Sequence, residues 1–177
     1  MKYRDDPGVA SYVLSIGQRN TREVVVDSLW QRILQISFPY QHNYLHEREE
    51  YSHPRSLSRA NVTLATLQNT VRQKVLVVEC KKSPDNRSGY APPGVWEGAK
   101  VQLKNFLLSY RQTQEPLACG IYAIVGVGNF AKFYHLRNSS DDLEGFEGNL
   151  TALNVDRDAN QVQAILDSMR NEIENAL

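Results

Sequence analysis

The chain has 177 residues, of which 41% are hydrophobic and 23% are charged, a balance that excludes extensive disorder and indicates a globular protein with a buried core. Lysine plus arginine equals aspartate plus glutamate at 20 each, so any surface that binds nucleic acid must be local. We find no apolar run long enough to span a membrane and no apolar core of a secretory signal near the first residues. We therefore expect an intracellular protein, cytoplasmic or nuclear, with no membrane partner.

The first strongly periodic segment is predicted to be a helix over residues 21–36. Asn20 is expected to cap it, with Glu23 completing a capping box. The helical spacing i, i+3, i+4, i+7 holds for four apolar positions: Val26, Leu29, Trp30 and Ile33. Residues 39–58 are polar and aromatic, and they predict an irregular connection.

Alternating apolar residues predict strands over 60–67 and 71–81, joined as a hairpin. Residues 82–94 contain three prolines and two glycines and predict a loop. An apolar stripe at helical spacing then predicts a helix over about 95–112.

Two further strands are predicted within residues 119–137, around the turn dipeptide formed by Gly128 and Asn129. Residues 138–157 are acidic and rich in turn formers, and we expect a loop. Asp158 is expected to cap a last helix.

Together these elements predict an α/β fold in which a mixed central sheet is flanked by helices. We expect residues 1–177 to form a single domain, with a core over about 21–137 and a C-terminal helix over about 158–177. Cys80 and Cys119 have no metal-binding spacing, so we interpret them as core thiols.

The segment 74–83, KVLVVECKKS, ends a buried-looking strand with two charged residues. Side chains alternate along a strand, so Glu79 and Lys81 share one face and Cys80 points to the other. A carboxylate that holds Mg²⁺ beside a lysine that positions water is a minimal arrangement for phosphodiester hydrolysis. The alternative is a surface ion pair at a strand end, which contributes little to stability.

The element order, the strand VLVVECKK, the following helix with Gln102 and the segment YAIVGVGNFAKFYHL together resemble the PD-(D/E)xK nuclease superfamily. The likeness is to the restriction-like domains found in fungal proteins and covers roughly residues 21–137. It implies a restriction-endonuclease-like core, Mg²⁺ or Mn²⁺ as cofactor, and hydrolysis of DNA or RNA.

The motif of that family has direct counterparts in this chain. Glu79 and Lys81 match the E-x-K pair, and Gln102 matches the helix glutamine that supports the site. Phe106 stands where the family often has a tyrosine. Either Glu23 or Asp27, which lie one helical turn apart, could supply the acid of the first helix.

The chain departs from the family at Asn61, which stands where an aspartate is expected before the hairpin strand. The resemblance makes Asn61 and Glu79 metal ligands together with Glu23 or Asp27. Asparagine offers an oxygen but no negative charge, and a hard cation is held mainly by anionic oxygens. We therefore expect weakened Mg²⁺ binding.

Three explanations of this asparagine stay open. The first is a domain that keeps the fold without cleaving nucleic acid. The second is an introduced substitution. The third is a carboxylate supplied from another position, for which the candidates are Glu23, Asp27, Glu47, Glu49 and Glu50.

A local basic surface is expected around the E-x-K pair, where it would contact the phosphates of nucleic acid. Its predicted members are Lys82, Arg87, Lys100 and Lys104. The alternative is a solvated helix face. Two functions therefore compete: a Mg²⁺-dependent nuclease, and a non-catalytic module of the same fold that binds nucleic acid or a protein partner.

His42 and His46 form a weaker candidate site, because residues four apart share one face of a helix and could bind zinc. Their segment has doubtful helicity and contains no H-E-x-x-H pattern, so solvated loop histidines are the alternative.

Overall fold

The computed structural model describes residues 2–18, 22–51, 59–68, 71–84 and 90–177. Its α-helices are α1 (Pro7–Ile16), α2 (Glu23–Ser37), α3 (Pro93–Arg111) and α4 (Ala159–Ala176). Its strands are β1 (Tyr44–Tyr51), β2 (Arg59–Gln68), β3 (Val71–Lys81), β4 (Ile121–Val127), β5 (Phe130–Leu136), β6 (Glu144–Gly145) and β7 (Leu153–Asn154). Short 3-10 helices are η1 (Tyr3–Asp5), η2 (Tyr40–His42) and η3 (Phe146–Gly148).

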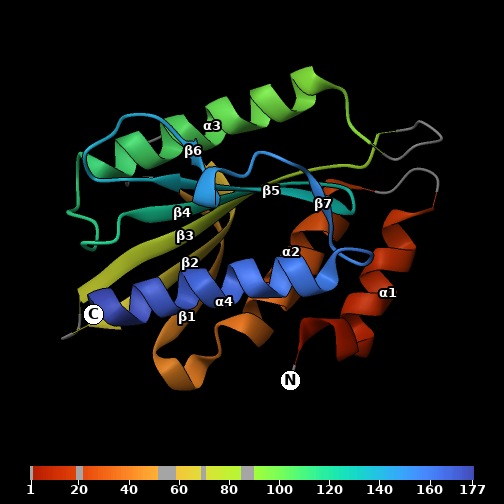
Figure 1. Ribbon diagram of the computed structural model, residues 1–177, viewed down its shortest axis with the longest axis horizontal. Coiled ribbons are helices and arrows are strands. Elements are labelled where there is room, and N and C mark those ends of the chain that lie inside the picture. Colours follow the sequence, from red (N-terminus) through yellow and green to blue (C-terminus); the bar gives the residue numbers. More distant parts are fainter. Residues whose placement is uncertain (1, 19–21, 52–58, 69–70, 85–89) are drawn as a thin grey trace.

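Within the described residues, seven strands form one mixed sheet (Figure 1). The order is β1-β2-β3-β4-β5-β6, and β7 pairs with β5 beside β6. The central pair β3 and β4 runs parallel, whereas the other pairings are antiparallel. The predicted α/β class with a mixed sheet flanked by helices is confirmed.

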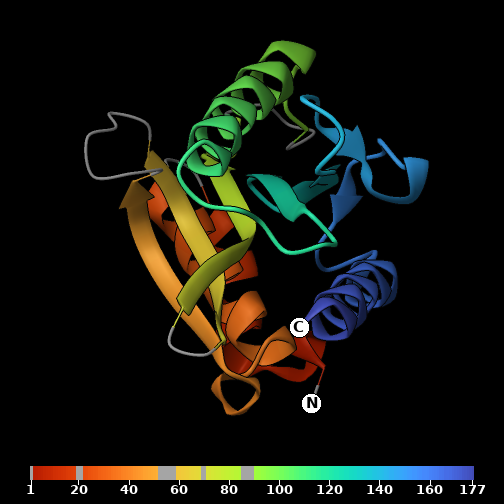
Figure 2. The ribbon, with the colours of Figure 1, turned by 90° about the vertical axis from the view of Figure 1, so that its left-hand side faces the viewer.

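Helices cover both faces of the sheet (Figure 2). The α3 face is apolar because Val77 and Val125 pack there against the buried stripe of α3. On the opposite face, Val78 and Cys80 pack with Trp30 of α2 and with apolar residues of α4. Alternation along β3 therefore sends successive side chains into two separate cores.

The hairpin of β2 and β3, the helix α3 and the β4–β5 turn all lie where the sequence predicts them. The turn works because Gly128 has a φ of 56°, a left-handed conformation that glycine adopts without steric cost. The helix expected at the C-terminus is α4, and Cys80 is the expected buried thiol. Cys119 is free and only partly buried.

The helix α1 and the strand β1 were missed. The helix α1 was not predicted, although Asp6 caps it by accepting a hydrogen bond from the Val9 N–H at 3.0 Å, and Pro7 occupies its first position. The expectation that residues 39–58 are irregular is wrong for β1. This edge strand carries charged side chains instead of an apolar pattern, which is common for sheet edges.

Both predicted helix caps need correction. The helix α2 begins at Glu23 after Arg22, which makes no side-chain cap, and Asn20 lies outside the described residues. The Asp158 carboxylate accepts from the N–H of Asn154 at 2.7 Å and not from its own helix. It therefore fixes the turn that precedes α4.

The expectation of a loop over residues 138–157 also needs correction. The short strands β6 and β7 both pair with β5, and two-residue strands leave no periodic pattern that a sequence could reveal. No helix in the described ranges is both long enough and apolar enough to cross a membrane.

We expect Gly126→Ala to lower the free energy of unfolding by about 2–3 kcal/mol, because overpacking a buried site is destabilising. A Cβ atom at Gly126 would lie 2.3 Å from Nε1 of Trp30, where α2 crosses β4. Gly98→Ala is the matched control, since a Cβ atom there has no neighbour within 4 Å. In the α3 interior this alanine should stabilise by about 0.5–1 kcal/mol. Urea denaturation measures both; equal effects would contradict the packing described.

Candidate functional site

The charged end of β3 forms the candidate site. Lys81 donates from Nζ to Oε1 of Glu79 at 2.7 Å, and the Glu79 side chain is almost fully buried while that of Lys81 is 26% exposed. Burial raises the pKa of Glu79 above its ordinary value, and the hydrogen bond from Lys81 partly opposes that rise. The pair therefore joins a buried carboxylate to a lysine that still reaches solvent.

The register of the central strands fixes the face on which this pair lies. Glu79 pairs with Val125 and Lys81 pairs with Val127 in the parallel ladder. Both valines belong to the core under α3, so both charged side chains lie on the α3 face of the sheet.

Asn61 contacts the same end of β3, but as part of the backbone pairing. Its Oδ1 accepts a hydrogen bond from the Cys80 N–H at 2.8 Å, just beyond Val62 and Val78, where the register of β2 and β3 ends. The amide oxygen thus takes the role of a backbone acceptor. The remaining amide nitrogen is a donor and cannot ligate a cation.

The two candidate acids of α2 lie across the strand from Glu79. Asp27 is buried, and its Oδ2 lies 3.8 Å from Nη2 of Arg48. Burial raises the pKa of the Cys80 thiol, and the charge of Asp27 and its hydrogen bond with that thiol raise it further. The negative charges of Glu23 and Asp27 add to the raised pKa of Glu79. Asp27 thus acts on Glu79 electrostatically from the α2 face.

The expected residues of α3 separate onto two flanks of that helix. Lys100 Nζ lies 5.4 Å from the ring centroid of Tyr134, and Lys104 pairs with Asp142, so both lysines face β5 and the segment after it. A helix turns by about 100° per residue, so Gln102 points to the opposite flank. Gln102 is exposed on that flank.

The remaining expected residues are Lys82, Glu47 and three residues about whose side chains the structure says nothing. Lys82 is exposed directly after Lys81. Glu47 lies in the row of Thr63 and Val77, and its carboxylate is paired with Arg72 at 2.5 Å and lies 3.7 Å from Lys74 Nζ, so it is directed away from Glu79 and Asn61. Those outside the described residues are Arg87 and the side chains of Glu49 and Glu50.

His42 and His46 do not form a common site, because each has a different partner. His42 of η2 lies 3.1 Å from Glu174 of α4, whereas His46 of β1 hydrogen-bonds to the Phe38 carbonyl at 2.7 Å. Nowhere in the described part of the chain do three or more His, Cys, Asp or Glu side chains form a group that could hold a metal ion.

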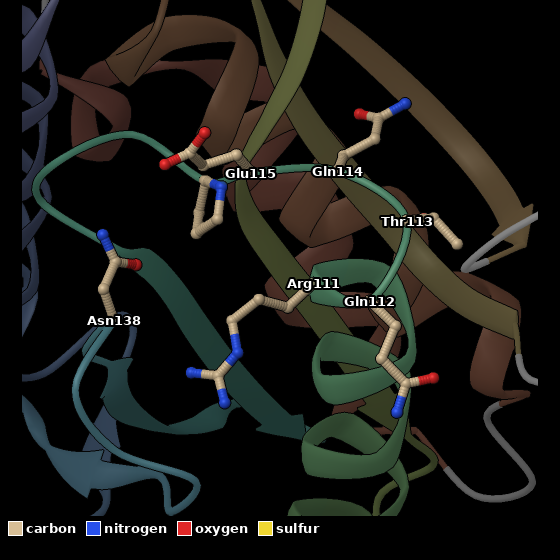
Figure 3. A pocket seen from close by; sticks show the side chains of 7 residues that line it. Arg111, Gln112, Thr113, Gln114, Glu115 and Asn138 are labelled. Carbon is tan, nitrogen blue, oxygen red and sulfur yellow. The ribbon is translucent and has the colours of Figure 1, made fainter.

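A polar pocket of about 430 Å³ lies at the other end of α3 (Figure 3). Arg111 lines it, but its guanidinium already pairs with Asp141 and donates to the Ser140 carbonyl at 2.7 Å. Asn138 donates to the Leu117 carbonyl at 2.9 Å. These hydrogen bonds hold the segment after α3 in place, so Arg111 and Asn138 have a structural role.

Sequence reasoning missed Lys132 of β5. This residue pairs with Val125, which in turn pairs with Glu79, so Lys132 lies in the same row as Glu79 on the α3 face. No sequence signal could reveal it, because the relation depends on β4 lying between β3 and β5.

No protein-family model matches the chain, and comparisons with curated proteins and with solved structures find no significant match. The site must therefore be judged on its chemistry. Mg²⁺ is held mainly by anionic oxygens. On the α3 face, Glu79 is already paired with Lys81, Asn61 is neutral, and Glu47 is paired with Arg72 and lies 3.7 Å from Lys74. These donors, the ones that the described residues place on this face, do not fit a Mg²⁺ site.

The raised pKa of Glu79 makes a prediction for stability. The Glu79 carboxyl binds its proton more tightly in the folded state than in the unfolded state. The protein therefore loses stability as the pH rises from the ordinary pKa of this carboxyl, 4.5, through its raised pKa in the folded state. Glu79→Gln removes this loss, so its free energy of unfolding relative to the unmodified chain should rise between about pH 4 and pH 7.

Urea denaturation across this pH range measures the difference. Gly98→Ala changes no ionisable group, so its difference in free energy of unfolding should not vary with pH, and it provides the reference. A difference that stays constant or falls with pH would show that burial does not dominate at Glu79.

Proposed function

We propose that the chain is a restriction-endonuclease-like domain that binds nucleic acid at the Glu79–Lys81 end of β3 without cleaving it. The observation that carries this proposal is the hydrogen bond from the Cys80 N–H to Asn61 Oδ1 at 2.8 Å. Asparagine supports the strand pairing there but brings no charge, so the ladder persists while the second anionic ligand is lost.

The lysines at this end can still hold a phosphate. Lys81 has three N–H donors and uses one toward Glu79, and its side chain is partly exposed. Lys82 follows it at the surface. Phosphate contacts of this kind need no metal and account for most sequence-independent affinity for nucleic acid.

Mg²⁺-dependent hydrolysis is the second candidate function, with Asp27 as the displaced second carboxylate. The observation in its favour is that the charge of Asp27 raises the pKa of Glu79, so the two groups are electrostatically close. The position of Asp27 beside Arg48 and Cys80 on the opposite face argues against shared ligation.

A cleavage assay on single-stranded and double-stranded DNA and RNA, with Mg²⁺ or Mn²⁺, distinguishes these candidates. We expect no cleavage by the unmodified chain and metal-dependent cleavage by Asn61→Asp. An aspartate could accept from Cys80 with one oxygen and offer the other to the metal. Adding Lys81→Ala should reduce the gained rate by about a hundredfold or more, the usual effect of losing a group that positions or deprotonates water.

Metal-dependent cleavage by the unmodified chain, abolished by Asp27→Asn, would replace the proposal with the hydrolytic candidate. Circular dichroism of each variant shows that it is folded.

Nucleic-acid binding has its own test. We expect Lys81→Ala with Lys82→Ala to weaken binding of labelled oligonucleotides about tenfold at low salt and to reduce the salt dependence of the affinity. Arg72→Ala with Lys74 left in place is the charge control, since Arg72 is exposed near the other end of β3, about 30 Å away. Fluorescence anisotropy measures both; equal losses, or no binding at all, would contradict the proposed function.

A further inference from the structure

An aromatic cluster lies beside the candidate site, where α3 begins and β5 starts. Its members are Tyr90, Trp96 and Phe130. Tyr90 packs edge-to-face on Phe130, with centroids 5.5 Å apart and planes at 80°, and it lies 6.1 Å from Trp96. Trp96 is buried, whereas Tyr90 is 44% exposed. Tyr90 is thus a partly exposed ring that packs against two other aromatic rings.

Cations stack on the same cluster. Lys132 Nζ lies 5.1 Å from the Trp96 centroid, and Arg157 Cζ lies 5.8 Å from the Phe130 centroid. Among the described residues, neither Lys132 nor Arg157 has a carboxylate within ion-pair distance. Their charges therefore remain available to an anionic ligand at the surface.

The strand register joins this cluster to the Glu79–Lys81 end of β3. Lys81 pairs with Val127, which pairs with Phe130, so Lys81 and Phe130 lie in one row two strands apart. Two strand spacings amount to about 10 Å. Lys132 occupies the next row, with Glu79, on the same face. The register therefore places Lys81, Lys132 and the aromatic cluster at the same end of the sheet, within two strands of one another.

We propose that this end of the sheet binds unpaired nucleic acid, with a base stacked on Tyr90 and the flanking phosphates held by Lys132, Arg157 and Lys81. This inference rests on the proposed function and adds the class of ligand. A partly exposed ring bordered by cations suits a base whose face is free, and base–aromatic stacking tolerates any base. A duplex hides its base faces in the stack, so it can use the cations but not Tyr90.

Fluorescence anisotropy with labelled single-stranded DNA, single-stranded RNA and blunt duplexes of the same length tests the proposal. We expect both single strands to bind more tightly than the duplex. Tyr90→Ala should weaken single-strand binding about tenfold or more, and Tyr90→Phe should preserve it. Lys132→Gln should weaken binding of every ligand and reduce its salt dependence.

The matched control is Tyr40→Ala, because Tyr40 is 56% exposed and packs on His46 at a different part of the molecule. It should leave affinity unchanged, and thermal melting confirms that each variant is folded. Equal binding of duplex, or no effect of Tyr90→Ala while the Lys81 and Lys82 double variant still loses affinity, would overturn the stacking inference and leave the proposed function standing. Absence of binding to every ligand would overturn both.

Discussion

The strands β3 and β4 run parallel at the centre of the sheet, with residues 76–81 opposite residues 122–127. Because this pair is buried on both faces, the register is strongly fixed, and a slip of one residue would exchange the two faces of either strand. The register places Glu79 and Lys81 on the α3 face and sends Cys80 toward α2. It also extends through β4 to β5, which aligns the charged end of β3 with Lys132.

In the function proposed above, the hydrogen bond between Asn61 and the Cys80 N–H keeps the strand pairing while the second anionic ligand of a metal site is absent. A carboxylate and a carboxamide of nearly the same shape can both accept from a backbone N–H, so the structural role tolerates either. The role in metal binding does not, because it needs negative charge. The side chain at position 61 therefore has two separable roles, and in the proposed function the lysines around it hold phosphate whichever residue stands there.

Much of this arrangement was predictable from periodicity. The β2–β3 hairpin, α3, the turn at Gly128 and α4 all carry regular apolar patterns, and alternation alone places Glu79 and Lys81 on one face. The strand β1 escaped prediction because it is a charged edge strand without such a pattern. The opposite positions of Gln102 and the α3 lysines follow from helix geometry, but the flank that faces β5 depends on tertiary packing. The resemblance to a nuclease family identified Asn61 as the informative departure, whereas its bond to the Cys80 N–H required the structure.

The most direct test of this account is a calorimetric titration of Mn²⁺ into the unmodified chain and into Asn61→Asp, without nucleic acid. We predict no measurable binding to the unmodified chain and saturable binding of one ion to Asn61→Asp, because the variant adds a negative charge at the position beside Glu79 where asparagine brings none. Equally tight binding to both would contradict the account. It would mean that a carboxylate from another position, with Asp27 the first to examine, already completes the site.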